Sequence, residues 1–154
     1  MANNGRADLR LVPMENALDL ASCQMDAARP HAFVTALHLD KHLLFGYVFR
    51  HQDYPWLMSW MNYTGNNRAA RGMEFSTQPF DISRQETVAM NPLFGTPTFR
   101  WLPAKGKIQT RFLMFYTRVP EAFSRIDDVR LEGGKLIVID RSGQRISIAT
   151  SRGL

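Results

Sequence analysis

A single carboxylate among aromatic side chains is the feature of this chain best suited to chemistry. Glu74 lies in a strand-like run, residues 70–80, that reads ARGMEFSTQPF and ends in a polar, proline-closed turn. It follows Trp56, Trp60 and Tyr63 closely in the sequence. A sugar ring needs flat aromatic surfaces for its C–H side and a charged acceptor for its hydroxyl groups. Glu74 is therefore the candidate catalytic residue, and the pattern predicts a carbohydrate site.

A structural role is the alternative for each of these residues. Glu74 could instead pair with an arginine on a neighbouring strand, and an exposed pair of that kind contributes only about 0–1 kcal/mol. Trp56 and Trp60 are four residues apart in a strand-like run, so both would face the same side. That spacing fits a core as well as a stacking platform. We expect at least one of the two in the core, because large aromatic side chains are usually mostly buried.

Arg71 and His51 are further candidates for binding a substrate, together with the two tryptophans. The forked donors of Arg71 could hold sugar hydroxyl groups. Arg71 is three residues from Glu74, so in a regular strand the two side chains point to opposite faces, and only a bulge at Gly72 would bring them together. His51 begins a polar turn that leads into the tryptophans, where a ligand-facing loop is expected.

The composition predicts one soluble domain. With 154 residues and 45% hydrophobic content, the chain can form one compact core spanning residues 1–154. A mean hydropathy of −0.25 and the absence of a long apolar run argue against a membrane span. Cys23 is the only cysteine and the four histidines form no zinc motif, so we expect no metal and no cofactor. No signal-peptide core follows the N-terminus, which predicts a cytoplasmic protein.

The net charge of +5 and the isoelectric point near 9.8 raise the question of nucleic-acid binding. The chain has no dense basic tract, no glycine-rich phosphate loop and no RNA-binding signature. Its basic residues lie in different segments: Arg68, Arg71, Arg100, Lys105, Lys107, Arg111, Arg118, Arg125 and Arg130. We therefore expect no specific nucleic-acid partner, and the absence of a long apolar run leads us to expect no membrane partner.

The N-terminal part of the chain has a helical pattern. Between Pro13 and Pro30, apolar residues recur at steps of three and four, with polar residues between them. The pattern predicts an amphipathic helix over residues 14–29, which Pro30 ends and whose apolar stripe packs on the rest of the domain.

Short runs rich in aromatic and β-branched residues follow Pro30, and these are typical of strands. No long helical pattern separates them, so antiparallel pairing is expected and the predicted fold is a mainly β antiparallel sandwich over residues 32–150. The candidate strands are 32–38, 43–49, 56–63, 69–77, 96–102, 109–118, 128–131, 135–140 and 145–150.

Turn residues refine this prediction. Glycine-containing turns at 132–134 and 141–144 predict a three-stranded meander at the C-terminal end. Glycine and asparagine make 64–67 a plausible turn between two strands. Asp81 is expected to cap a helical turn over 81–86.

Three segments in this order resemble the aldose 1-epimerase (galactose mutarotase) superfamily, in particular the C-terminal half of a bacterial branch. They are LFGYVF at 44–49 with YPWL at 54–57, ARGMEFSTQPF at 70–80, and LFGTPTFRW at 93–101. The resemblance implies a supersandwich that holds a sugar on an open concave face. It also implies that Glu74 is the catalytic base, working with a histidine acid from another part of the sandwich.

A complete supersandwich of this family is far longer than 154 residues, and the half that brings the family's histidines is missing. We therefore expect a carbohydrate-binding module for a small-molecule sugar or glycan, with absent or vestigial activity. An active epimerase-like isomerase, with Glu74 as base and a histidine as acid, is the second hypothesis. A non-enzymatic, self-associating interaction domain is the third. Half a sandwich leaves one face uncovered. We expect a homodimer to cover it, and the N-terminal helix of the same chain is the alternative.

Overall fold

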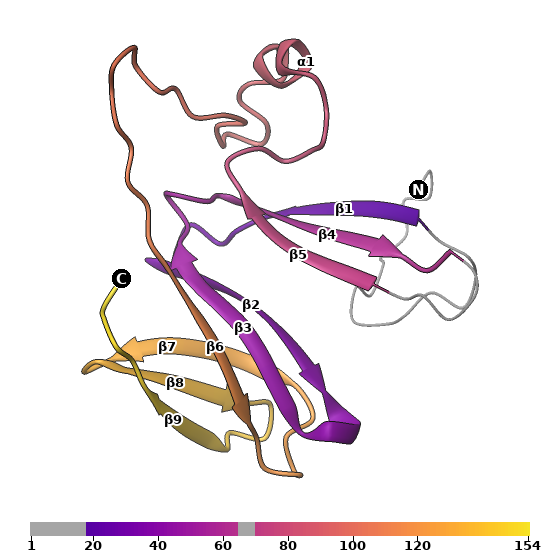
Figure 1. Ribbon diagram of the computed structural model, residues 1–154, viewed down its shortest axis with the longest axis vertical. Helices are drawn as coiled ribbons and strands as arrows, with labels where there is room; N and C mark the ends of the chain where they lie inside the picture. Colours follow the sequence, from indigo (N-terminus) through magenta and orange to yellow (C-terminus); the bar gives the residue numbers. More distant parts are fainter. Residues whose placement is uncertain (1–17, 65–69) are drawn as a thin grey trace. The chain divides into compact units, whose positions relative to one another are not determined.

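The computed structural model describes residues 18–64 and 70–154, which form a mainly β protein with three antiparallel sheets (Figure 1). The chain divides into two compact units. Unit 1 comprises Met1–Gln24 and Pro55–Arg100, and unit 2 comprises Met25–Tyr54 and Trp101–Leu154. In the described residues, no helix is long and apolar enough to cross a membrane.

Unit 1 contains one three-stranded antiparallel sheet and a short helix. The sheet order is β1-β4-β5, and the elements are β1 (Leu18–Gln24), β4 (Trp56–Asn62), β5 (Ala70–Ser76) and the helix α1 (Arg84–Ala89). The central strand β4 begins at the predicted residue and pairs with β5 without a register shift. The expected turn at 64–67 lies outside the described residues from position 65 onwards.

The predicted N-terminal helix is wrong where the structure describes it. Residues 18–24 form strand β1, which pairs with β4 from Leu18 opposite Asn62 to Gln24 opposite Trp56. Residues 14–17 of the predicted helix lie outside the described residues. Pairing along all of β1 satisfies backbone groups that would otherwise leave an edge of β4 open, and such tertiary pairing overrides a weak helical propensity.

The predicted strand at 96–102 is also absent from the structure. The segment begins in a tight turn, in which the N–H of Leu93 donates to Thr96 O at 3.0 Å and the N–H of Thr96 donates to Leu93 O at 2.9 Å. Pro97 follows, and a proline has no N–H to donate to a sheet. Its carbonyl instead accepts a hydrogen bond from the indole of Trp56 at 2.8 Å.

Helix α1 starts at a different cap from the one predicted. Ser83, rather than Asp81, is the N-cap, and its hydroxyl accepts from the N–H of Glu86 at 3.3 Å. The Glu86 carboxylate in turn accepts from the N–H of Ser83 at 3.0 Å. This reciprocal capping box satisfies two N–H groups that Asp81 would not satisfy together.

Unit 2 contains two three-stranded antiparallel sheets, ordered β2-β3-β6 and β7-β8-β9. Their elements are β2 (His31–His38), the 3-10 turn η1 (Leu39–Lys41), β3 (Leu43–Arg50), β6 (Phe112–Arg118), β7 (Ile126–Glu132), β8 (Lys135–Asp140) and β9 (Arg145–Ala149). The predicted C-terminal meander is confirmed. Its turns use glycine at positive φ, with φ of 55° at Gly133, 76° at Gly134 and 86° at Gly143.

The core of unit 2 includes side chains of both sheets and of the connection between β6 and β7. The sheets contribute Leu44, Val48, Phe115, Val129, Leu136 and Val138, and the connection contributes Val119 and Phe123. Gly46 makes room for one of these core side chains. A Cβ atom on Gly46 would lie 2.5 Å from Cζ of Phe115 and 2.9 Å from Cγ2 of Thr35. The Phe115 ring therefore lies across the glycine, which is its direct partner in the β3–β6 ladder.

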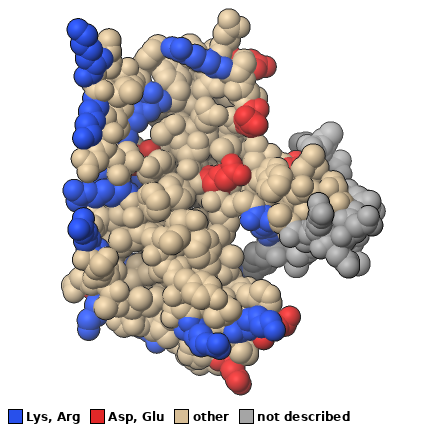
Figure 2. Space-filling view, viewed as in Figure 1, with Lys and Arg blue, Asp and Glu red and all other residues tan. Residues whose placement is uncertain are grey.

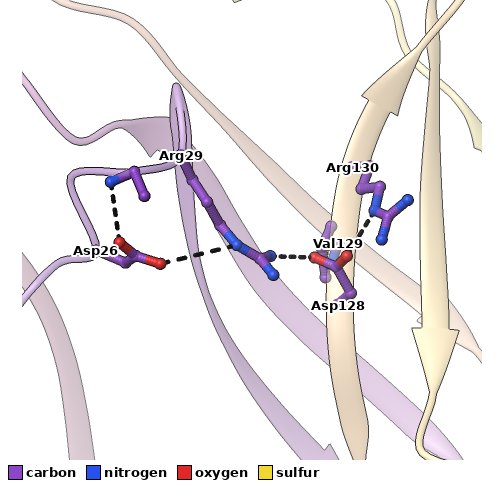
Figure 3. Close-up of polar contacts among 6 residues, drawn as sticks. Asp26, Arg29, Asp128, Val129 and Arg130 are labelled. Atoms are coloured by element: carbon purple, nitrogen blue, oxygen red, sulfur yellow. Dashed lines mark hydrogen bonds and ion pairs between the residues drawn. The ribbon is translucent and has the colours of Figure 1, made fainter.

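A buried carboxylate connects the turn before β2 to β7 (Figure 3). Asp128 accepts from Arg29 Nη1 at 2.6 Å, from Arg130 Nε at 2.5 Å and from the N–H of Val129 at 2.9 Å. Burial alone would raise the pKa of Asp128, but the hydrogen bonds and charges of Arg130 and Arg29 outweigh burial and lower it. Asp26 lies 4.0 Å from Arg29 Nε and completes the cluster.

Asp140 organises the end of β8 in a similar way. Its carboxylate accepts from the N–H of Ser142 at 2.7 Å, Ser124 at 3.0 Å and Arg125 at 3.1 Å. The hydrogen bonds from Ser142, followed by those from Ser124 and Arg125, hold the pKa of Asp140 far below its usual range.

We predict that Asp140→Asn destabilises the protein by about 1–3 kcal/mol near neutral pH, because the amide cannot accept all of these hydrogen bonds. The pKa of Asp140 is depressed on folding, so its contribution is fully present above the unfolded pKa of about 3.9 and is lost as the pH falls toward the folded value. Urea unfolding at a series of pH values should show the wild type and the variant converging in acid. Asp127→Asn is the control, because that carboxylate is 41% exposed.

We predict that Gly46→Ala destabilises unit 2 by about 1–3 kcal/mol, because the new methyl group would overlap the Phe115 ring. Gly153→Ala is the matched control, since a Cβ atom there has no neighbour within 4 Å among the described atoms. Equal unfolding midpoints for the two variants would show that the core does not depend on this close approach.

Candidate functional site

Glu74, Gly72 and Trp60 come together on one face of the sheet in unit 1. Gly72 and Glu74 are two residues apart on β5 and so share a face, and Trp60 is the direct partner of Gly72 on β4. A Cβ atom on Gly72 would lie 2.8 Å from Glu74 Oε1 and 3.3 Å from Cβ of Trp60. The carboxylate of Glu74 therefore folds back over the glycine, beside the base of the Trp60 side chain.

This group is accessible and has an apolar residue next to it. Trp60 is 36% exposed and Glu74 is exposed, whereas Met58, directly opposite Glu74 on the same face, is buried. An exposed carboxylate beside an indole ring can accept hydrogen bonds from a ligand whose apolar side lies against the ring. The arrangement suits recognition of a flat, hydroxyl-bearing molecule.

Asn62 extends the same face, and the sequence analysis did not select it. It lies two residues beyond Trp60 at the end of β4. Its Oδ1 accepts from the N–H of Thr64 at 3.3 Å and from the Thr64 hydroxyl at 2.7 Å. Because these bonds engage the amide oxygen, the NH₂ group is what Asn62 can offer to a ligand. The spacing of two from Trp60 is the sequence signal that identifies it.

Trp56 has a structural role. It shares a face with Trp60, but it is only 2% exposed, and its Nε1 donates to Pro97 O. The expectation that at least one of the two tryptophans lies in the core is confirmed for Trp56. Trp60 is the one of the two that a ligand can reach.

Arg71 lies on the face opposite Glu74. Strand β5 is regular and has no bulge at Gly72, so the alternation expected for a regular strand holds. The guanidinium of Arg71 lies beside Met61, with Nη2 3.6 Å from the sulfur, and its Cζ is 6.0 Å from the centre of the Tyr63 ring. Arg71 therefore does not join the carboxylate in one site.

His51 belongs to unit 2, in the turn after β3. Its Nδ1 is buried and makes no hydrogen bond within the described residues. The next carboxylate along the chain, Asp53, pairs with Arg50 at 2.6 Å. All four histidines lie between residues 31 and 51, so the sequence of unit 1 contains no histidine to accompany Glu74.

Metal binding gains no support from the described part of the chain. Across residues 18–64 and 70–154, no three side chains of the types His, Cys, Asp and Glu are grouped so that they could hold a metal ion.

We predict that Trp56→Phe lowers the unfolding free energy by about 1–3 kcal/mol, since it removes the donor to a carbonyl inside unit 1. Trp60→Phe is the matched control and should change stability by less than about 0.5 kcal/mol, as is usual at exposed positions. Urea unfolding followed by far-UV circular dichroism measures both. A larger loss at Trp60 than at Trp56 would reverse the two assigned roles.

Comparison with known proteins gives this chain no family: no family model, no curated protein and no solved structure matches it. What can be inferred about function therefore rests on its own residues, and above all on the arrangement of Glu74, Gly72 and Trp60.

Proposed function

We propose that this protein is a carbohydrate-binding module that takes a small-molecule sugar or glycan at Glu74 and Trp60. The observation that carries the proposal is the Glu74 carboxylate lying over Gly72 beside an exposed indole ring. We further propose that the two sheets of unit 2 form a β-sandwich, as the side chains from both sheets in its core suggest.

Each group at the site has a part in recognising a sugar. The C–H side of a pyranose ring lies on Trp60, where apolar surface is removed from water. Hydroxyl groups at the edge of the ring donate to the carboxylate of Glu74, and a hydrogen bond to a charged group contributes about 1.5–3 kcal/mol. The NH₂ group of Asn62 donates to a sugar oxygen farther along the same face.

Aldose 1-epimerase activity is the second candidate, favoured by the match of Glu74 to the family's catalytic base. In that reaction Glu74 takes the proton of the anomeric hydroxyl while an acid protonates the ring oxygen, and the bond between the anomeric carbon and the ring oxygen breaks. The open-chain aldehyde then recloses on either face. We rank this second because unit 1, which carries the base, contributes no histidine to act as the acid.

We predict that Glu74→Gln abolishes binding of aldoses while the fold survives. Proton NMR of an aldose panel measures binding as line broadening and catalysis as exchange between anomers in the same sample. A bound sugar should also raise stability by about 2.7 kcal/mol at a hundredfold excess over its dissociation constant, so a thermal shift supplies a second readout.

Glu121→Gln is the control for charge, because Glu121 is an exposed carboxylate of unit 2. Broadening lost in Glu74→Gln and kept in Glu121→Gln supports the site. Anomer exchange that disappears only in Glu74→Gln would favour epimerase activity over binding alone. Broadening that both variants retain would place the sugar elsewhere and remove the basis of the proposal.

A further inference from the structure

The longest stretch of this chain without a carboxylate carries a net positive charge. Residues 87–120 contain no Asp or Glu and carry Arg100, Lys105, Lys107, Arg111 and Arg118. These five cations equal the whole net charge of +5, because the other fourteen basic residues balance the fourteen acidic ones. All but Arg100 belong to unit 2. We call the exposed side chains of residues 101–118 the acid-free surface.

Exposed apolar side chains lie among these cations. Trp101 is 66% exposed, Leu102 58%, Phe112 48%, Met114 64% and Tyr116 65%. Large apolar groups that are exposed together on one face mark an interaction site, and Phe112, Met114 and Tyr116 share one face of β6. Single exposed apolar residues are ordinary. Here, however, every charged residue between Glu86 and Glu121 is a cation.

Strand β6 explains why the apolar groups face outward. Leu113 and Phe115 point to the core of unit 2, so Phe112, Met114 and Tyr116 occupy the other face of the sheet. On β3, Phe45 lies opposite Tyr116 and Tyr47 lies opposite Met114, on that same face. The rings of Phe45 and Tyr47 meet edge-on, with their centres 4.9 Å apart. The outer face of the sheet β2-β3-β6 therefore carries aromatic and apolar side chains. It is exposed at Met114 and Tyr116, whereas Phe49, opposite Phe112 on the same face, is buried.

The turn that leads into this face presents a cation at its tip. The N–H of Gly106 donates to Pro103 O at 2.8 Å, and Lys105 has a φ of 59°, in the left-handed region. That position of a tight turn favours glycine or asparagine over lysine. Figure 2 shows several Lys and Arg side chains along the left edge of the view.

We propose that the acid-free surface binds an anionic lipid bilayer. Cations held among exposed tryptophan, tyrosine and aliphatic side chains, with no carboxylate between them, are the chemistry of an interfacial lipid contact: the cations meet headgroup phosphates and the apolar groups enter the acyl boundary. The contact is peripheral and uses residues of unit 2, whereas the proposed carbohydrate site uses residues of unit 1.

Other polyanions and a second copy fit this surface less well. A nucleic acid or an acidic polysaccharide would use the cations and aromatic rings but would leave the aliphatic Leu102 and Met114 in water. A second copy that docked through the same face would bring two sets of cations together without a carboxylate to offset them. The expectation of no membrane partner rested on the absence of a long apolar run, and a peripheral contact requires no such run.

The test is co-sedimentation of the full chain with vesicles of phosphatidylcholine, with and without phosphatidylglycerol. We expect binding to the anionic vesicles, weak binding to the neutral ones, and a loss of affinity as salt is raised. Trp101 should also lose exposure to a water-soluble quencher when anionic vesicles are added, and a Trp101→Phe variant assigns that signal.

Lys105→Gly is the sharpest variant, because it removes a cation from the surface and also relaxes the left-handed backbone. Its fold should be as stable as the wild type or more so, and combined with Lys107→Gln it should weaken vesicle binding about twenty-five-fold, at about fivefold for each cation. Met114→Ser should weaken it further. Lys135→Gln with Arg145→Gln removes two exposed cations of the sheet β7-β8-β9 and should leave binding nearly unchanged.

Several outcomes would overturn the proposal. The first is that the protein does not bind phosphatidylglycerol vesicles, and the second is that the Lys135→Gln, Arg145→Gln control loses as much vesicle affinity as the test variant. The third is that a single-stranded oligonucleotide or an acidic polysaccharide displaces the protein from vesicles at a lower concentration than added anionic vesicles do. Concentration-dependent dimerisation that Met114→Ser abolishes would assign the surface to a second copy instead.

Discussion

Packing of the Phe115 ring across Gly46 is the contact on which the arrangement of unit 2 depends. The two residues are direct partners in the β3–β6 ladder, and a side chain at position 46 would occupy the place of the ring. Because side chains alternate along a strand, fixing Phe115 inward also fixes Leu113 inward and Met114 and Tyr116 outward. A slip of one residue would turn Met114 and Tyr116 inward and the core side chains of β6 outward. One glycine thus fixes both the interior of the unit and the face that it presents to water.

Unit 1 uses the same device for a different purpose. Gly72 also lies inside a strand and leaves room for a neighbouring side chain, but the group that occupies the room is the carboxylate of Glu74. A glycine in a strand costs stability because it has no side chain to pack, and it often marks a place where another group approaches closely. At Gly46 the group that approaches is part of a core, and the site is structural. At Gly72 it is an exposed anion beside Trp60, and the site is open to a ligand.

Local patterns in the sequence predict most of the strands. Alternation and glycine turns identify β2, β3, β4 and the meander β7-β8-β9, because these elements are determined by neighbours along the chain. The predictions that were wrong concern segments whose structure depends on distant residues, or a capping pattern that was not recognised. Residues 18–24 carry a helical period, but their pairing with a strand more than thirty residues away decides their conformation. The segment at 96–102 has apolar residues of the right type, yet Pro97 serves as an acceptor for Trp56. The cap at Ser83 could have been found, since Ser83 and Glu86 have the spacing of a capping box.

The functional surfaces follow the same division between local and nonlocal information. Glu74 and Trp60 could be identified from the sequence by residue type. The register that places Gly72 opposite Trp60 could not be predicted, so the position of the carboxylate over the glycine could not be predicted either. The distribution of charges, in contrast, can be obtained from the sequence alone. Nine basic residues in different segments suggest a dispersed charge, whereas the positions of the carboxylates show that thirty-four consecutive residues, 87–120, have none. An electrostatic surface is determined by where the opposite charges are missing as much as by where the cations gather, because a nearby carboxylate cancels the field of a cation within a Debye length.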